Sequence, residues 1–435
     1  MTISTVIIAF LVMIGVMMAG FPIAVVMVLM GAAGGVLAFG WPLVDSMGPV
    51  MWGVMNENLL TAIPLFILLG ELMLRSGMAD RMYECLSLWM NRLPGGLLHS
   101  NIGCCALFAA TSGSSVATAA TVGTVAVPAL NARGYDKSKS LGSIAAGGTL
   151  GILIPPSVNL LIYGSLSETS IGQLFVAGIV PGLLLTGLFM LYIIISNREG
   201  SSADSVVREE VSLSLKLRSL SALIAPGIIF GIVMGSIYMG IATPTESAAL
   251  GVVVALLLAA CGGHLNLSFF NQCFMQTART TGMVLLIVLS AFVLNLTLSL
   301  TGVAQVVTTW VTSLGLSPTV LLMIFVVFYI LLGMFMDVLS MMVLTIPIAV
   351  PVVVAAGIDP IWFGIFIIIM CELGMITPPV GMNLYVVHGI RKDDGPFSDV
   401  IRGVIPYVFI MIAFAVLLIA VPGIATWLPQ TMYER

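Results

Sequence analysis

Long apolar runs constrain this chain more than any other sequence feature. Residues 4–40 contain no charged side chain. Of the 435 residues, 60% are hydrophobic and only 8% are charged, whereas a soluble protein carries about 25% charged residues. This leaves too little polar surface for a soluble globule and excludes soluble enzymes, nucleic-acid-binding proteins and disordered scaffolds. Because the runs are long and do not alternate, the sequence predicts an all-α polytopic membrane protein rather than a transmembrane barrel.

The positions of the runs predict the order of the membrane spans. Residues 4–40 are too long for one span of about 20 residues, and we divide them into two at the Gly-Phe-Pro break that ends at Pro22. Amphipathic stretches at 79–92 and 264–279 suit helices that lie in the membrane interface. Further spans are expected at 59–76, 141–165, 171–196, 219–239, 243–261, 281–301, 360–389 and 402–427.

The chain is expected to consist of two repeated units. Leu150–Pro156 (LGILIPP) matches Leu373–Pro379 (LGMITPP), and an Ala-Val-Pro triplet at 126–128 matches another at 349–351 with the same offset. A charged segment at 197–218 separates residues 1–196 from residues 219–435 and is expected to be a cytoplasmic linker.

Charge polarity predicts that the two units are inverted in the membrane. Basic residues precede the first Pro-Pro span at 133–139, whereas they follow the second at 391–392. Basic clusters mark cytoplasmic loops. Inverted repeats with interrupted helices are typical of transporters, with the binding site at the repeat interface near the middle of the membrane. The alternative is a chance resemblance between apolar, Gly/Pro-rich segments.

The Pro-Pro pairs predict interrupted helices with exposed backbone carbonyls. A proline has no N–H and clashes with the carbonyl four residues earlier, so Pro155 and Pro156 free the carbonyls of Gly151 and Ile152. The second pair does the same at Gly374 and Met375. Such oxygens are tolerated at membrane depth where they line a cavity or bind an ion. The alternative is a kink in which neighbouring side chains or water satisfy these groups.

Two further segments predict re-entrant helical hairpins. The first is about 97–131, with the tip Thr111-Ser112-Gly113-Ser114-Ser115, and its alternative is small-residue helix packing. The second is about 317–356, with Asp337 at its tip, and an acid inside an apolar run is a functional candidate.

The other acids within apolar runs have simpler interpretations. Glu246 is expected to belong to an N-terminal helix cap, and Glu71 is expected to pair with Arg75. Glu372 either faces the site or forms a structural pair.

The motifs GILIPPS (151–157), TPPVGMNLYV (377–386), TSGSS with ATAAT (111–121) and TPTESAA (243–249) together resemble the large membrane subunit of tripartite ATP-independent periplasmic (TRAP) transporters. The resemblance covers essentially the whole chain. It implies an elevator-type, multi-pass transporter of a bacterial inner membrane that takes up carboxylates or similar organic acids with Na⁺. It also implies two partners besides the lipid bilayer, a small four-helix membrane subunit (here a separate chain) and a periplasmic substrate-binding protein.

Matching the motifs residue by residue gives the expected site. The resemblance implies at least two Na⁺ ions, no organic cofactor and no transition metal. A first Na⁺ site would use Ser112, Gly151, Ile154 and Pro156. A second Na⁺ site would use Gly333, Gly374, Thr377 and Pro379. The substrate cavity would be lined by Ser114, Asp337, Asn159 and Asn383.

Val338 and Leu339 follow Asp337 at positions where the resemblance implies small polar residues. No enzymatic activity and no nucleic-acid partner are expected. Two alternatives remain open: a stand-alone cation-coupled carboxylate carrier that needs no binding protein, and an ion channel, because carbonyl cages also build filters.

Overall fold

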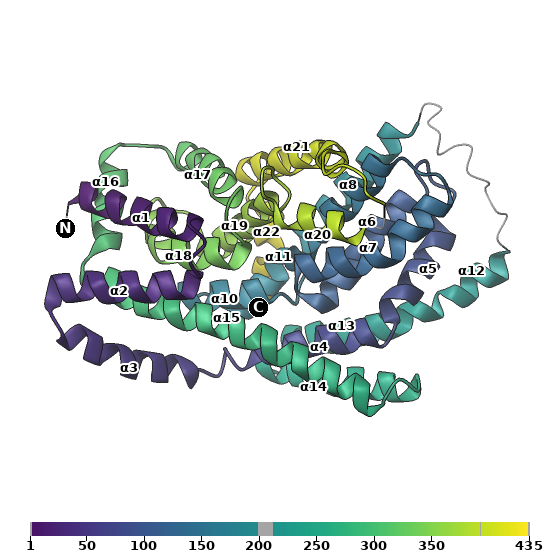
Figure 1. The fold of residues 1–435 in the computed structure, drawn as a ribbon, viewed down its shortest axis with the longest axis horizontal. Coiled ribbons are helices and arrows are strands. Elements are labelled where there is room, and N and C mark those ends of the chain that lie inside the picture. Colours follow the sequence, from purple (N-terminus) through teal and green to yellow (C-terminus); the bar gives the residue numbers. More distant parts are fainter. Residues whose placement is uncertain (1, 199–211, 392, 434–435) are drawn as a thin grey trace.

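The computed structural model describes residues 2–198, 212–391 and 393–433, and in these ranges the chain forms helices and no strands (Figure 1). The helices are α1 (Ile3–Met18), α2 (Ile23–Phe39), α3 (Pro42–Met55), α4 (Ala62–Arg75), α5 (Met78–Met90), α6 (Leu97–Ser112), α7 (Ser115–Ala132), α8 (Lys137–Gly148), α9 (Leu150–Leu153), α10 (Val158–Ser167), α11 (Ile171–Ser196), α12 (Leu213–Ser219), α13 (Ser221–Tyr238), α14 (Pro244–Cys261), α15 (Leu267–Leu300), α16 (Val303–Ser313), α17 (Pro318–Gly333), α18 (Val338–Ala355), α19 (Pro360–Met375), α20 (Met382–Ile390), α21 (Ser398–Ala420) and α22 (Gly423–Tyr433).

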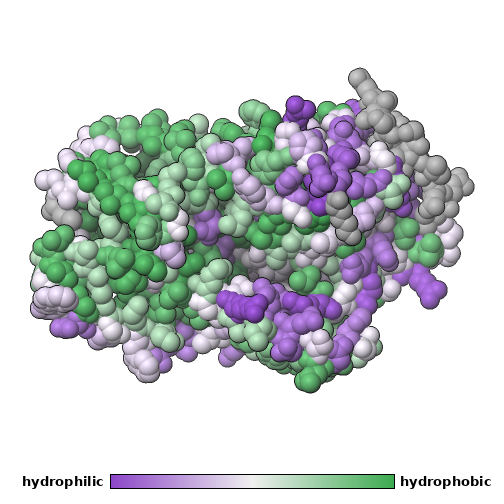
Figure 2. Space-filling model, viewed as in Figure 1, coloured by the Kyte–Doolittle hydropathy of each residue, from purple (hydrophilic) through white to green (hydrophobic). Residues whose placement is uncertain are grey.

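The helices are those of a polytopic membrane protein. Among the described residues, seven helical segments are long and apolar enough to cross a membrane, or up to nine if each of two bent helix pairs counts as one span. One bent pair joins α4 to α5 at 63°, and the other joins α8–α9 to α10 at 44°. Figure 2 shows apolar residues over much of one face, especially around α1, α2 and α16. Large apolar side chains therefore lie on the outer surface, as a lipid-facing protein requires.

Two helical hairpins lie near the broken helices. In the first, α6 and α7 are joined by Gly113, in a left-handed conformation with φ 58°, and Ser114, whose hydroxyl accepts a 3.3 Å hydrogen bond from the Ala117 N–H. Glycine adopts this conformation without a steric penalty, and serine is a favoured N-cap. In the second hairpin, residues 334–337 join α17 to α18, and Asp337 is the N-cap.

Both Pro-Pro pairs interrupt a helical path. The first path runs through α8 and α9, stops before Pro155 and resumes in α10. The second runs through α19, which ends at Met375, and resumes in α20 at Met382. The Pro155–Pro156 and Pro378–Pro379 peptide bonds are cis. The breaks follow from the missing N–H groups and the ring clashes of proline.

Helix α15 differs from its prediction. An interfacial helix at 264–279 and a separate span at 281–301 were expected, but the structure has one continuous helix of 34 residues. Near its start, the Gln272 side chain accepts a 2.8 Å hydrogen bond from Arg75 of α4. Near its end, the Thr297 hydroxyl donates to the Gly31 carbonyl of α2 at 2.8 Å. One helix therefore connects two distant parts of the molecule, as Figure 1 shows.

Several local predictions can be compared directly with the structure. The span expected at 171–196 coincides with α11. Thr243 and Glu246 form the expected capping box, and Glu71 pairs with Arg75 at 3.0 Å. Helices α3 and α16 were not predicted. Of the expected linker, residues 199–211 lie outside the described residues, and the chain is helical again from α12.

Candidate functional site

The tip of the first hairpin rests on the first Pro-Pro break. A Cβ atom added to Gly113 would lie 3.3 Å from the carbonyl oxygen of Pro156. One added to Gly151 would lie 2.7 Å from the carbonyl oxygen of Ser114 and 2.8 Å from the Thr118 hydroxyl. Only glycine allows the tip to approach so closely. All residues from 151 to 160 are buried, whereas Ser112 and Ser114 at the tip are half-buried.

Oxygen atoms gather at this first contact. The Ser112 hydroxyl shares a 2.7 Å hydrogen bond with the Thr118 hydroxyl and lies 3.5 Å from the Ser114 carbonyl oxygen. The structure thus brings three of the four residues expected for the first Na⁺ site, Ser112, Gly151 and Pro156, to one tip. The fourth, Ile154, is the C-cap that follows α9, and its side chain lies against Gly182 of α11.

The end of α17 in the second hairpin meets the second broken helix backbone to backbone. A Cβ atom on Gly333 would lie 2.5 Å from the Gly374 Cα, and one on Gly374 would lie 2.6 Å from the Gly333 Cα. The Thr377 hydroxyl donates to the Leu373 carbonyl at 2.6 Å, which satisfies an oxygen near the break. Pro379 is exposed. Three of the four residues expected for the second Na⁺ site therefore lie at the end of α19.

Ser114 and Asp337 occupy equivalent places, because each is the N-cap of the second helix of its hairpin. The Asp337 carboxylate accepts hydrogen bonds from the backbone N–H groups of Leu339 (3.1 Å) and Ser340 (3.4 Å), and from the Ser340 hydroxyl. Asp337 is half-buried. It therefore stabilises the start of α18, where anionic groups are favoured by the helix dipole.

A buried polar contact joins the two halves of the chain. The Ser115 hydroxyl of α7 donates a hydrogen bond to the Glu372 carboxylate of α19. Both side chains are almost fully buried, and the other Glu372 oxygen has no hydrogen-bond partner among the described residues. The sequence drew attention to Glu372 as an intramembrane acid and to Ser115 as part of the first hairpin tip, but it gave no sign that the two residues are partners.

The two asparagines expected near the substrate are also buried. Asn159 lies in the first turn of α10. Within the described ranges, neither polar atom of the Asn383 side chain has a hydrogen-bond partner. Its amide nitrogen lies 3.1 Å from the position of a Cβ atom on Gly148, and the Ser115 carbonyl oxygen lies 3.2 Å from the same position. Asn383 of the second unit therefore lies beside the first hairpin.

The donor atoms at the tips suit a hard monovalent cation better than a transition metal. In the described part of the chain, no group of three or more His, Cys, Asp or Glu side chains could hold a metal ion. The tips instead offer backbone carbonyls and hydroxyls, which are the groups that coordinate Na⁺ in interrupted membrane helices.

Comparison with known proteins identifies the family. Residues 6–424 match the family model described as "Tripartite ATP-independent periplasmic transporter, DctM component". The chain belongs to the DctM family. The resemblance predicted from the motifs is therefore confirmed. A DctM-family chain is a transporter subunit and a multi-pass protein of the bacterial inner membrane, and the word tripartite describes a transporter with three components.

Individual relatives agree with this assignment, and a solved structure shows a similar fold. The C4-dicarboxylate TRAP transporter large permease protein DctM of Pseudomonas aeruginosa is 34% identical over 91% of this chain and 92% of its own. The sialic acid TRAP transporter large permease protein SiaM of Vibrio cholerae is 33% identical over 96% of both chains. The YdaH transporter of Alcanivorax borkumensis shares the fold, with a TM-score of 0.66 at 15% identity over 97% of this chain and 99% of that one.

Proposed function

We propose that this DctM-family chain is the large membrane subunit of a Na⁺-coupled importer of small organic acids, carboxylates such as C4-dicarboxylates or related acids. It would work with a small four-helix membrane subunit and a periplasmic substrate-binding protein. The relatives from P. aeruginosa and V. cholerae are named for C4-dicarboxylates and for sialic acid. Both substrates are carboxylates, which supports this substrate class.

The observation that carries the proposal is the contact of each hairpin tip with the backbone of a broken helix. Gly151 meets the Ser114 carbonyl at one tip, and Gly374 meets Gly333 at the other. The prolines that follow each glycine remove hydrogen-bond donors from the neighbouring carbonyls. Oxygen atoms in such places are available to a cation, and Na⁺ bound there would supply positive charge near an anionic substrate.

Transport would require the two hairpins and the two broken helices to move together. We assign these elements to the mobile unit of two inverted repeats, in an elevator-type cycle, and the long helix α15 to the fixed scaffold. Coupling requires that Na⁺ and substrate stabilise the same state, so that each raises the affinity for the other by the same factor. Ser112 and Asp337 lie at the two tips, and substituting these side chains tests the hypothesis most directly.

The test is uptake of a labelled carboxylate into proteoliposomes that contain all three components, driven by a Na⁺ or a K⁺ gradient. We expect uptake with Na⁺ only, and a loss of at least about tenfold in Ser112→Ala and in Asp337→Ala, since each removes a polar ligand or cap at a tip. Ser313→Ala and Asp45→Ala change exposed residues of the same types on α16 and α3 and serve as controls.

Thermal unfolding in detergent shows whether each variant still folds. Wild-type uptake in both tip variants would contradict the site, and equal uptake in K⁺ would contradict Na⁺ coupling. Uptake by this chain without a binding protein would favour a stand-alone carrier, and single-channel conductance would favour a channel.

A further inference from the structure

A buried hydrogen bond connects the first hairpin tip to the second broken helix. Ser115 is the first residue of α7, directly after the N-cap at the tip, and its hydroxyl donates to the Glu372 carboxylate of α19. Both side chains are almost fully buried. A buried polar group that loses its only hydrogen-bond partner is strongly destabilised. The two residues therefore hold the start of α7 and the end of α19 in a fixed relative position.

Each end of this hydrogen bond lies beside one of the two glycine contacts. The Ser115 Cα lies 2.8 Å from the position of a Cβ atom on Gly151, in the first broken helix. Glu372 precedes Gly374 by two residues on the same helix, and Gly374 lies against Gly333 of the second hairpin. A movement of the first turn of α7 therefore displaces groups at the first tip, and a movement of the last turn of α19 displaces groups at the second.

A second buried hydrogen bond joins the same two broken helices away from both tips. The Tyr163 hydroxyl of α10 donates to the Pro360 carbonyl at 2.6 Å. Pro360 and Gly374 lie at opposite ends of α19, about 21 Å apart along the helix axis. The Tyr163 hydrogen bond therefore holds α10 to the start of α19, and it offers an internal comparison for the bond at the tips.

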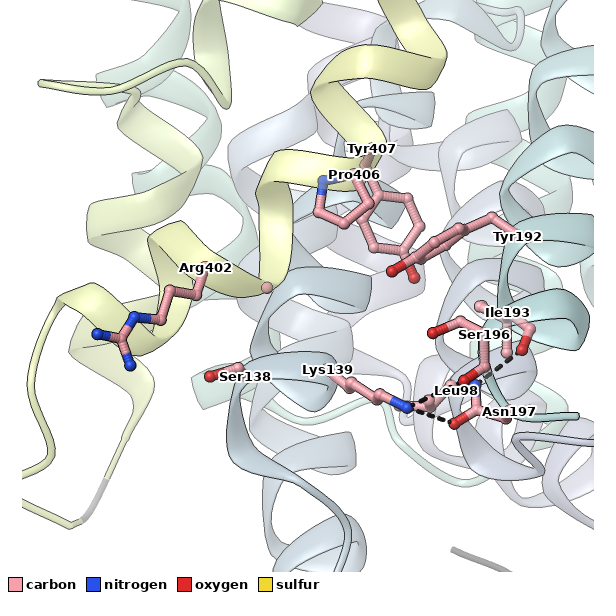
Figure 3. A pocket seen from close by; sticks show the side chains of 11 residues that line it. Leu98, Ser138, Lys139, Tyr192, Ile193, Ser196, Asn197, Arg402, Pro406 and Tyr407 are labelled. Atoms are coloured by element: carbon pink, nitrogen blue, oxygen red, sulfur yellow. Dashed lines mark hydrogen bonds between the residues drawn. The ribbon is translucent and has the colours of Figure 1, made fainter. Parts of the chain in front are cut away.

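Polar contacts at the far end of the first broken helix do not reach the tips either. Near the start of α8, the Lys139 ammonium group donates to the Ser196 carbonyl at 3.2 Å and to the Asn197 side-chain oxygen at 2.9 Å (Figure 3). These two hydrogen bonds join α8 to the end of α11, within the first half of the chain. The cavity beside them has a volume of about 190 Å³ and is lined by none of the tip residues.

We propose that the Ser115–Glu372 hydrogen bond makes the two tips cooperative, so that a Na⁺ ion bound at one tip raises the affinity of the other. This inference rests on the proposed function, because it uses a Na⁺ ion at each hairpin tip. An ion at the first tip holds the start of α7 against the first break, and through Glu372 this orders the end of α19. Less ordering then opposes binding of the second ion, which is a source of positive cooperativity. Ser115 and Glu372 are positioning residues, and neither needs to contact an ion.

The test is binding of radioactive Na⁺ to the purified full chain in nanodiscs, which gives both the number of ions bound and the Hill coefficient. For the wild type we expect two ions and a Hill coefficient of at least about 1.4, which corresponds to about fivefold coupling of two equal sites. Ser115→Ala removes the donor, and Glu372→Asp withdraws the acceptor by one methylene group. Both variants should still bind two ions, but with a Hill coefficient of about 1, since the sites then act independently.

Two matched variants should keep the cooperativity. Glu372→Gln retains an acceptor oxygen of the same reach, and Tyr163→Phe removes the buried hydrogen bond at the other end of α19. Thermal unfolding in detergent shows which variants fold, and if Ser115→Ala does not, the comparison of Glu372→Asp with Glu372→Gln decides. Loss of cooperativity in Glu372→Gln or in Tyr163→Phe would overturn the proposal.

The same binding experiment separates this inference from the proposed function. Two bound ions with an unchanged Hill coefficient in Ser115→Ala or Glu372→Asp would overturn the coupling and leave the Na⁺ sites in place. No Na⁺ bound by the wild type would overturn both the coupling and the Na⁺ dependence proposed above.

Discussion

The two hairpin tips make the same kind of contact with a broken helix but stabilise it in different ways. The first tip has a turn of two residues, lies on a break that is buried throughout, and is tied to α19 by the Ser115–Glu372 hydrogen bond. The second tip has a turn of four residues, meets α19 where the Gly333 and Gly374 backbones come together, and leaves Phe335 and Pro379 exposed.

The two Pro-Pro motifs are similar in sequence, but the breaks that they form are not equally exposed at the outer surface. The residues of the first break are buried, and a side-chain hydrogen bond inside the core ties the first tip to α19. Two glycine backbones pack together at the second tip, but they do not cover the residues at the end of the second Pro-Pro break, where Pro379 and Val380 are exposed. In this structure, the second break is therefore the one that can be reached from the outer surface.

The largest expected effect comes from adding a methyl group at the second tip. In Gly374→Ala, the new Cβ would lie 2.6 Å from the Gly333 Cα, and backbone cannot rotate away as a side chain can. Overpacking of this kind costs about 1–3 kcal/mol or more, so we expect a lower unfolding temperature and loss of uptake. Gly187→Ala on α11, where nothing lies within 4 Å, is the control. If the two variants behave alike, the glycine contact does not hold the second tip.

A smaller effect is expected from the hydrogen bond at the first tip. Ser115→Ala should cost about 1–3 kcal/mol, because it leaves a buried carboxylate without its partner. Glu372→Met should also destabilise the protein, whereas the double variant should cost less than the sum, with a coupling energy of about 0.5–3 kcal/mol. Unfolding of the four proteins in detergent measures this coupling, and strictly additive losses would contradict the contact.

Ser340→Ala gives the matched comparison at the second tip. Asp337 would keep its two backbone donors there, so the loss should be below about 1 kcal/mol.

The smallest effect is expected where the charged loop after α20 is tied to the start of α8, which joins the two broken helices. Asp393, which follows α20, pairs with Arg391 at 3.0 Å and also with Lys137 at the start of α8. Hydrogen bonds from Arg391 and then Lys137 hold the Asp393 pKa below its ordinary value. A carboxyl whose folded-state pKa is lowered adds stability above its unfolded pKa of about 3.9, and this is lost as the pH falls further.

Asp393→Asn should therefore lower the unfolding temperature slightly near pH 7, and the difference from the wild type should shrink below about pH 4. High salt should also reduce it, because these side chains are partly exposed. A difference that grows on acidification would contradict this account.

The sequence predicts those parts of the site that depend on local chemistry. Proline cannot continue a helix, so both breaks could be placed from Pro155 and Pro378, and the tip of the first hairpin followed from Gly113 and its serine neighbours. Contacts between distant segments could not be predicted in this way. Nothing in the sequence pairs Ser115 with Glu372, because the two residues meet only after the halves have packed together.

The continuity of α15 was also hidden from the sequence. Polar residues such as Gln272 and Arg279 made the first half of α15 resemble an interfacial helix. In the structure, Gln272 hydrogen-bonds to Arg75 of α4, and the helix continues beyond it. Local polarity alone does not show whether a polar residue ends a span or contacts another helix.

Because α15 is one continuous helix, the angle about its axis between its two contact faces is fixed. The residues of α15 that contact α4 and α2, Gln272 and Thr297, are separated by about seven turns of a single helix. Each residue turns the helix by about 100°, so one residue inserted between them would direct one contact face away from its partner, whereas seven would restore it to within about 20°. Lineages of this chain can therefore lengthen α15 by whole pairs of turns far more easily than by single residues.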